Sequence, residues 1–288
     1  MNVAVVLLLI ITVFNCIAQL QEYSGKISNT ERSRNQHFCG GQGRNIQRRS
    51  VGGVAAKRGE FPWIASVFVE DSKIKPIACT GVMISTRHLL TAAHCVTKRV
   101  RNHYSLCGSG RHPSTIYEQL NEANTTVYVG SHCRVPRWCS YKTPEYSIVQ
   151  MHVYPGYNPC NFDNDLAIVE ISGNVYRVGV PICMPSENEE LSVELVAAGY
   201  GINPHDTLHR RLHAVNLTYY TLTSANAILT KTPGRSICSG DSGGPLFKTT
   251  QSRAIVVGIT SSHTGDCKGF GPTEGSMIDF KAYDYNSA

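Results

Sequence analysis

Beyond residue 18 the sequence has no apolar run that approaches the length of a membrane span, for which about 20 residues are needed. It has no internal repeat, which excludes an array of stacked units. Its 27 Lys and Arg exceed its 21 Asp and Glu, but no aromatic interleaving or nucleic-acid-binding motif accompanies them. We therefore expect no nucleic-acid partner and no membrane partner.

Metal-binding patterns are also missing. The 11 histidines are scattered along the chain, and no carboxylate-rich loop has the spacing of a calcium site. No pattern in the sequence calls for a bound cofactor either. We expect a protein that functions without a metal ion or cofactor.

The N-terminus carries one apolar run, from Val3 to Phe14, with a plausible cleavage site after Ala18. The run is too short to cross about 30 Å of hydrocarbon, so it predicts a signal peptide over residues 1–18 rather than an anchor. Its removal takes Cys16 and leaves ten of the 11 cysteines. An even number in a secreted chain predicts disulfides rather than metal ligands. Sequons at Asn124 and Asn216 indicate a secreted, extracellular glycoprotein.

The character of the chain changes at residue 50. Residues 19–49 are polar and show no apolar period, which predicts a pro-segment or linker. From residue 50 onward, short β-type runs alternate with turn signals, which predicts an all-β sandwich or barrel. Two irregular stretches, residues 99–125 and 131–146, carry three cysteines and predict surface insertions closed by disulfides. The predicted strands are Trp63–Glu70, Pro76–Ser85, Thr126–Gly130, Ser147–Tyr154, Leu166–Ile171, Leu195–Gly199, Ala214–Tyr220 and Ala254–Ile259.

The strongest functional signal is Gly240-Asp241-Ser242-Gly243-Gly244. A serine between glycines on a tight turn exposes its hydroxyl and leaves backbone N–H groups free to bind an oxyanion. The α/β-hydrolases use the same pattern, but their acid and histidine follow the serine. Here the candidates precede it, at His94 and Asp165. Chain order and the lack of predicted alternating helices therefore exclude an α/β-hydrolase esterase.

Ser242, His94 and Asp165 supply the parts that nucleophilic catalysis by serine requires. A serine hydroxyl is a poor nucleophile near neutral pH and needs a neutral imidazole to accept its proton. The imidazole in turn needs an acceptor on its other nitrogen, and a carboxylate there stabilises the imidazolium as it forms. We predict that these three residues form a catalytic triad.

With these residues in view, the chain resembles a trypsin/chymotrypsin-family serine protease over residues 50–288. The resemblance implies two six-stranded antiparallel β-barrels with the active site in the cleft between them. It also implies an oxyanion hole formed by the N–H groups of Gly240 and Ser242. The long loops and the stretch at residues 181–185 resemble divergent secreted members from nematodes. The matching motifs are Val51-Gly52-Gly53, Gly59-Glu60-Phe61-Pro62-Trp63, Cys79 to Cys95, Phe162 to Ile171 and Cys238 to Phe247.

The family pattern also implies a set of disulfides, which are Cys79–Cys95, Cys238–Cys267 and Cys39–Cys183. The last of these would tether the pro-segment to the catalytic domain after cleavage. The four remaining cysteines allow three pairings, between which the sequence does not decide. These four are Cys107, Cys133, Cys139 and Cys160.

The segment around Arg49 resembles a zymogen cleavage site. The resemblance implies that an activating protease cuts after Arg49 and that the new amine of Ser50 pairs with Asp241. Family members usually begin with Ile or Val, so serine forfeits about 2–3 kcal/mol of apolar burial and adds a hydroxyl that needs a partner. We expect the active conformation to be less populated for this reason. The alternative is a basic linker that is trimmed without consequence.

Specificity follows from the residues that match the substrate pocket. Ser236 falls at its base, where trypsin-like enzymes carry Asp, so cleavage after Lys or Arg is not expected. Ser261 matches the family serine that hydrogen-bonds toward Asp165. His263 and Thr273 replace the usual glycines of the pocket walls, which predicts a shallow pocket for a small or medium apolar side chain at P1. His263 could instead contact an acidic group.

We therefore predict a secreted serine endopeptidase that is made as a zymogen and acts on proteins or peptides as a monomer, open to inhibition by protein protease inhibitors. The alternative is a catalytically silent homologue that serves as a secreted binding or regulatory protein. Ser50, Ser262, His263 and an atypically short segment at residues 202–237 support this alternative, whereas the complete triad favours the enzyme.

Overall fold

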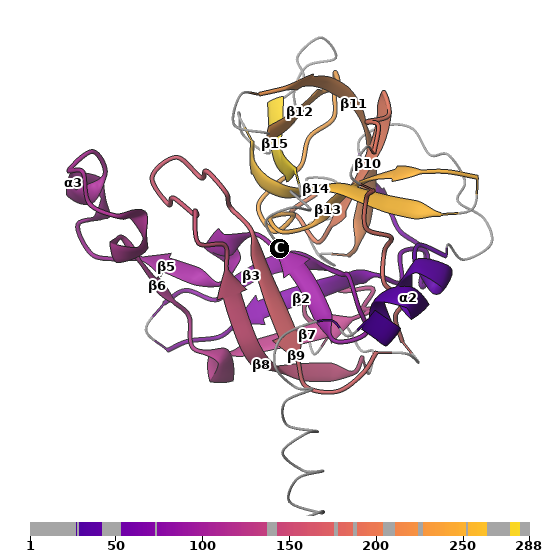
Figure 1. The fold of residues 1–288 in the computed structure, drawn as a ribbon, viewed down its shortest axis with the longest axis horizontal. Coiled ribbons are helices and arrows are strands. Elements are labelled where there is room, and N and C mark those ends of the chain that lie inside the picture. The colour runs from indigo at the N-terminus through magenta and orange to yellow at the C-terminus, as the bar shows by residue number, and fades with distance from the viewer. Residues whose placement is uncertain are drawn as a thin grey trace, which may run out of the picture.

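Two antiparallel β-sheets form the framework of the described chain, one above the other in Figure 1. The structure is a computed structural model that describes residues 27, 29–41, 53–72, 74–136, 143–175, 178–186, 189–203, 211–223, 227–251, 253–263 and 277–282. The helical elements are α2 (Asn29–Phe38), η1 (Ala93–Cys95), α3 (His103–Leu106), η2 (Pro113–Thr115) and η3 (Glu122–Asn124). The strands are β1 (Val54–Ala55), β2 (Ile64–Val69), β3 (Ile77–Met83), β4 (His88–Thr91), β5 (Thr97–Arg99), β6 (Tyr117–Gln119), β7 (Thr125–Val129), β8 (Glu145–Val153), β9 (Ala167–Ile171), β10 (Glu194–Gly199), β11 (His213–Leu222), β12 (Ala227–Lys231), β13 (Pro245–Thr249), β14 (Ala254–His263) and β15 (Met277–Ala282).

The first sheet is a closed barrel in the order β2-β3-β4-β9-β8-β7. Every residue of β2 is buried, as expected for a β-branched and aromatic run that packs on both faces. Buried side chains of β2, β4, β7 and β9 belong to one contiguous core that contains Trp63 and also residues of the second sheet. The closed barrel leaves no unpaired edge among its six strands.

The second sheet runs β1-β11-β10-β13-β14-β15-β12, and β12 also pairs with β11. This second pairing curls the sheet toward a barrel, and β1 adds a short seventh strand. The predicted class, a chymotrypsin-like double β-barrel, is confirmed. All eight strands predicted from the sequence are present with small shifts of their ends. The short strands β1, β4, β5, β6, β12, β13 and β15 were not predicted.

An aromatic cluster joins the two sheets. The ring of Phe247 in β13 packs edge-on against Trp63 and Phe61, with centroids 5.8 Å apart in both pairs. Such edge-to-face pairs add to the apolar area they bury. All three residues are buried, so this cluster fixes the relative position of the two sheets beneath the loops that carry the predicted site.

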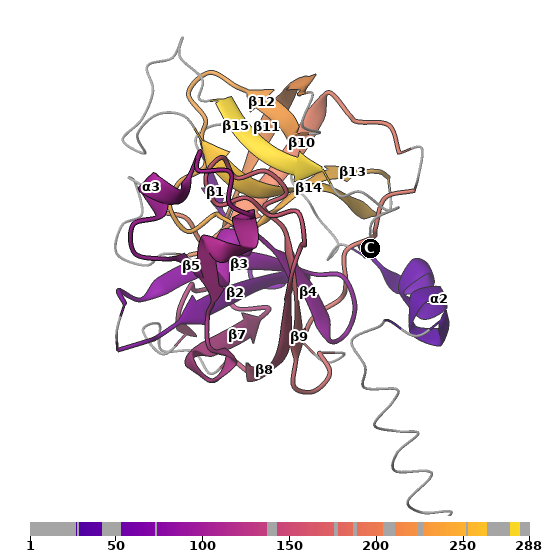
Figure 2. The same cartoon turned by 60° about the vertical axis from the view of Figure 1, so that its left-hand side comes forward.

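Helix α2 corrects one expectation. Residues 19–49 have no apolar period, yet part of this polar segment forms a helix at one side of the first barrel, away from α3 (Figure 2). Arg253 Nη1 donates to Gln36 O at 2.8 Å, and Thr86 Oγ1 donates to Glu31 Oε1 at 2.8 Å. Apolar periodicity in the sequence does not predict this helix, because polar contacts and a disulfide hold it in place rather than an apolar face.

Three disulfides have both partners in the described residues: Cys39–Cys183, Cys79–Cys95 and Cys107–Cys160. The first two were implied by the family pattern, and the third is one of the pairings that the sequence left open. Cys133 and Cys238 are also disulfide-bonded. The expected partner Cys267, as well as Cys139, lies outside the described residues.

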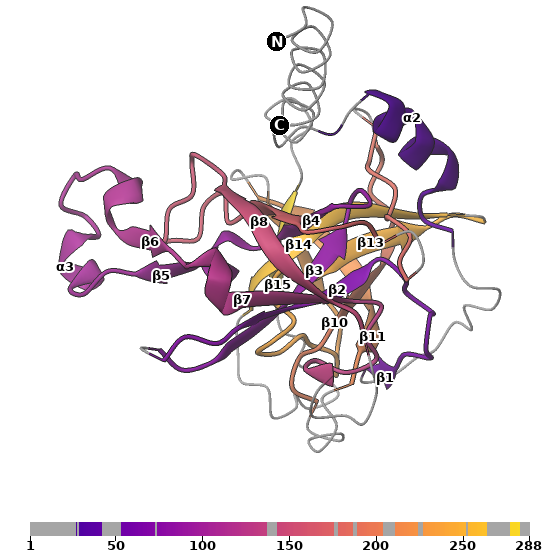
Figure 3. The ribbon, with the colours of Figure 1, turned by 90° about the horizontal axis from the view of Figure 1, so that it is seen from below.

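The insertion that carries β5, β6, α3 and η2 projects from the first barrel in both Figure 1 and Figure 3. The predicted signal peptide at residues 1–18 lies outside the described residues, as do Arg49, Ser50 and Thr273. Within the described ranges, no helix combines the length and the apolar character needed to cross a bilayer.

Candidate active site

His94 and Asp165 meet at one edge of the first barrel. His94 lies in η1, directly after β4, and Asp165 lies directly before β9. The last pair of the β4–β9 ladder joins Thr91 to Ala167, so the chain leaves β4 where it enters β9. His94 Nδ1 lies 2.7 Å from Asp165 Oδ2, and the backbone N–H of His94 donates to Asp165 Oδ1 at 2.9 Å. Both carboxylate oxygens therefore hold the same histidine.

The Asp165 carboxylate is fully buried, and a lowered pKa favours its ionised form. Ser261 in β14 donates its hydroxyl to Asp165 Oδ2 at 2.6 Å. Burial acts to raise the pKa of Asp165, but the His94 hydrogen bond and charge, together with the Ser261 hydrogen bond, outweigh it and lower the pKa below the ordinary value. A buried anion in this place keeps the proton of neutral His94 on Nδ1 and leaves Nε2 free to accept one.

Ser242 lies in the turn before β13, next to the same edge of the first barrel. Thr80 in β3 donates its N–H to Ser242 O and its hydroxyl to Gly240 O, both at 2.8 Å. Cys95 Sγ, in the disulfide beside His94, lies 3.6 Å from Ser242 O. The Ser242 hydroxyl makes no hydrogen bond to any described residue, and such contacts are often long before substrate binds.

The turn leaves two backbone amides available. The N–H groups of Asp241 and Gly243 donate to Cys238 O and Thr260 O, whereas those of Gly240 and Ser242 donate to no described residue. Gly243 has φ +80°, and a Cβ there would collide with Thr91 Oγ1 and Thr80 O. Glycine is therefore required for the turn to sit against the first barrel, and the two unused amides can serve an anion.

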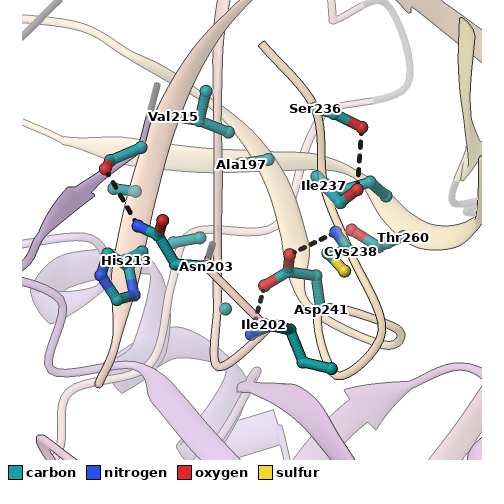
Figure 4. Close-up of a pocket in the computed structure, with 15 residues that line it drawn as sticks. Ala197, Ile202, Asn203, His213, Val215, Ser236, Ile237, Cys238, Asp241 and Thr260 are labelled. Carbon is teal, nitrogen blue, oxygen red and sulfur yellow. Dashed lines mark hydrogen bonds between the residues drawn. The ribbon is translucent and has the colours of Figure 1, made fainter. Parts of the chain in front are cut away.

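Asp241 lines a small cavity behind this turn (Figure 4). Its carboxylate accepts hydrogen bonds from the N–H groups of Gly201 and Cys238, both at 2.8 Å. Burial raises the pKa of Asp241, because these contacts only partly compensate the loss of water. The cavity has a volume of about 70 Å³, and Gly53 also lines it. Gly53 and Asp241 thus lie at the same cavity.

Ser236 lines the same cavity and donates its hydroxyl to Ile237 O at 2.8 Å (Figure 4). The structure thus places Ser236 on the wall shared with Asp241. His263 ends β14, but its side chain and all of Thr273 lie outside what the structure describes. Of the four residues predicted to line the substrate pocket, Ser261 is the one brought into contact with Asp165.

The one cluster of metal-type ligands found in the described part of the chain is Cys79, His94 and Cys95, with ligand atoms within 4.8 Å of one another. Both sulfurs belong to a disulfide. They are therefore not thiolates, and the cluster does not have the ligands of a metal site.

Two residues of the site were missed by the sequence analysis. Phe162 packs its ring edge-on against His94, with centroids 5.6 Å apart and an interplanar angle of 89°. The Arg99 guanidinium carbon lies 4.9 Å from the centroid of the Phe162 ring. Phe162 precedes Asp165 by three residues and begins the matching motif Phe162 to Ile171. No sequence pattern connects Arg99 with this motif.

The two β-barrels, with a histidine–aspartate pair on one and a serine turn on the other, define the chymotrypsin-like class of protein. The chain belongs to the trypsin family, because the family model described as Trypsin matches residues 50–283.

Three relatives are each identical to this chain at just over a quarter of the aligned positions. The chain is 28% identical over 233 residues to a venom serine protease of Polistes dominula, covering 74% of this chain and 76% of that protein. It is 29% identical over 240 residues to vitamin K-dependent protein C of Rattus norvegicus, covering 74% and 46%. It is 28% identical over 259 residues to melanization protease 1 of Drosophila melanogaster, covering 80% and 61%. The chain thus spans less than two thirds of the last two relatives, and the expected nematode affinity finds no support among them.

Proposed function

We propose that this protein is a serine endopeptidase that hydrolyses peptide bonds through an acyl-enzyme, with Ser242 as nucleophile, His94 as general base and acid, and Asp165 as the residue that orients His94. The observation that carries the proposal is the buried, ionised Asp165 that binds His94 through both oxygens beside the Ser242 turn. Family membership supports the same activity.

In the proposed reaction, Ser242 Oγ attacks the carbonyl carbon of the scissile bond and transfers its proton to His94 Nε2. Asp165 stabilises the imidazolium that forms. The free N–H groups of Gly240 and Ser242 bind the developing oxyanion. His94 then gives the proton to the leaving amine, and the C–N bond breaks. Water repeats the sequence on the acyl-enzyme and restores the Ser242 hydroxyl.

The Asp241 cavity supports activation by cleavage. We propose that proteolysis after Arg49 by a separate protease frees the amine of Ser50, which enters this cavity and pairs with Asp241. Gly53 already lines the cavity, so the three preceding residues need to span only a short distance. A protonated amine would offset the burial that raises the pKa of Asp241. The chain would be secreted after removal of residues 1–18 and glycosylated at Asn124 and Asn216.

For specificity we propose a small or medium apolar residue at P1, since uncharged Ser236 offers no partner to Lys or Arg. The substrates are proteins or peptides, protein protease inhibitors bind the same cleft, and the enzyme acts as a monomer. A catalytically silent homologue with a binding or regulatory role is the second candidate, favoured by Ser50 and by the absence of a hydrogen bond between Ser242 and His94 among the described residues.

Fluorophosphonate labelling separates the two candidates. The full secreted chain is labelled before and after cleavage at Arg49–Ser50, with Ser242→Ala as the inactive variant. Ser239→Ala, an exposed serine of the same loop, is the matched control. The proposal predicts labelling after cleavage in the wild type and in Ser239→Ala, and none in Ser242→Ala. Cleaved, folded wild type that stays unlabelled would establish the silent homologue.

A further inference from the structure

The positively charged Arg99, on the strand pair β5–β6, lies beside the proposed active site. Arg99 is exposed at the end of β5, and its guanidinium carbon lies 4.9 Å from the centroid of the Phe162 ring. The same ring contacts His94 edge-on, with centroids 5.6 Å apart. Arg99, Phe162 and His94 therefore form a row that leads from the insertion to the proposed general base.

A disulfide holds this row together. Cys107 of the insertion bonds to Cys160, two residues before Phe162, with the Cα atoms 5.7 Å apart. The loop that carries Phe162 is closed by two backbone hydrogen bonds, from Phe162 N to Asn158 O at 2.8 Å and from Asn158 N to Asp163 O at 2.9 Å. Phe162 has φ +60°, an uncommon conformation for a bulky residue. The edge-on position of the ring against His94 is therefore held by the surrounding loop contacts.

The charge of Arg99 is not neutralised within the described structure. The neighbouring Lys98 pairs with Glu118 at 3.0 Å, whereas Arg99 forms no ion pair with a described residue. The carboxylate of Asp163, the residue after Phe162, accepts a hydrogen bond from Asn161 at 2.6 Å and forms no ion pair with Arg99. A guanidinium stacked on an aromatic face keeps its N–H edge available for a carboxylate, which it binds with two parallel hydrogen bonds.

We propose that Arg99, seated on Phe162, selects substrates that carry an acidic side chain close to the scissile bond. The inference rests on the proposed endopeptidase activity and adds a substrate class to it. Because the Phe162 ring contacts His94, a peptide bound at His94 would come close to this ring. An Asp or Glu side chain there meets a cation that has been positioned in advance. Arg99 is a specificity residue and takes no part in the proton transfers.

Paired peptides test the proposal. Each pair differs by Glu against Gln at one of the three positions on either side of the scissile bond, and kcat/KM is measured with cleaved enzyme. We expect Glu to exceed Gln by about fivefold at one position, the size of a favourable exposed ion pair. The ratio should fall toward one as ionic strength rises, because salt screens exposed charges. A role of Arg99 in stability alone would not produce this salt dependence.

Charge variants complete the test. Arg99→Gln should abolish the preference, and Arg99→Glu should reverse it. Arg111→Glu, an exposed arginine of the same insertion, makes the same charge change away from Phe162 and should keep the preference. Fluorophosphonate should label Ser242 in all three variants, and the rate of labelling should be unchanged in Arg111→Glu. The inference is overturned if labelled wild type cleaves Glu and Gln peptides equally, or if Arg99→Gln keeps the ratio. Absence of labelling would instead overturn the proposed function, and the inference with it.

Discussion

Replacing Ser261 with alanine tests the electrostatic account of the site. The Ser261 hydroxyl donates to Asp165 Oδ2 at 2.6 Å, and both residues are buried. A hydrogen bond to a charged group contributes about 1.5–3 kcal/mol to the free energy of unfolding. Alanine removes the donor and leaves the carboxylate with its two His94 contacts. We therefore expect the free energy of unfolding at pH 7 to fall by about 2 kcal/mol.

The loss should depend on pH in a defined direction. Burial acts to raise the pKa of Asp165, but the contacts with His94 and Ser261 lower it overall. A lowered pKa gives stability that is present above the unfolded-state pKa of about 3.9 and is lost as pH falls through the folded-state pKa. Without Ser261 the folded-state pKa rises, and this contribution becomes smaller. The difference between variant and wild type should therefore be full above about pH 5 and shrink at lower pH.

Urea unfolding, followed from neutral to acidic pH, measures both effects. Ser262→Ala is the matched control, because Ser262 is the half-buried neighbour in β14 and makes no hydrogen bond to Asp165. The reasoning is refuted if Ser261→Ala and Ser262→Ala lose the same stability. It is refuted equally if the loss in Ser261→Ala is independent of pH.

Three further predictions concern the triad, a glycine turn and a disulfide. Asp165→Asn should reduce fluorophosphonate labelling by about 10⁴-fold with little change in circular dichroism, since an amide favours the wrong histidine tautomer; labelling at the wild-type rate would refute the triad. Gly243→Ala should prevent assembly of the site, because the added Cβ would collide with Thr91 and Thr80. Gly108 also has positive φ but has no atom within 4 Å of an added Cβ, so Gly108→Ala should lower the free energy of thermal unfolding by only about 1 kcal/mol. Similar losses in the two variants would contradict the packing argument. Replacing both Cys107 and Cys160 with Ser should lower the free energy of unfolding by up to about 4 kcal/mol for a loop of 53 residues; an unchanged midpoint in urea would show that the loop is fixed without the disulfide.

Long strands with strong local signals were predictable. Ile64–Val69 is β-branched or aromatic at most positions, and turns bound it on both sides, so the sequence alone predicts a buried strand. Short strands such as His88–Thr91 and Thr97–Arg99 carry too few residues to show a period. They become strands because a neighbouring strand supplies their hydrogen bonds. Local pattern cannot report a partner that lies far away in sequence.

Helix α2 was missed for a related reason. Its residues are almost all polar, so neither periodicity nor composition distinguishes it from a solvated linker. Arg253, more than 200 residues away, donates to the carbonyl oxygens of Gln36 and His37 at its C-terminal end. Cys39, the first residue after the helix, forms a disulfide with Cys183. Contacts of such long range are decided by the fold and leave no local trace.

The sequence by itself predicted an all-β sandwich or barrel, and its resemblance to a known family implied two barrels. It also identified His94, Asp165 and Ser242 as candidates, because turn chemistry and chain order are properties of short motifs. The tertiary structure decided which groups meet. It gave Asp165 its two contacts with His94 and its hydrogen bond from Ser261. It placed Asp241 in a cavity lined by Gly53 and the guanidinium of Arg99 over the Phe162 ring beside His94. These contacts depend on distances of a few ångströms between residues far apart in the chain, and only the packing of two barrels sets such distances.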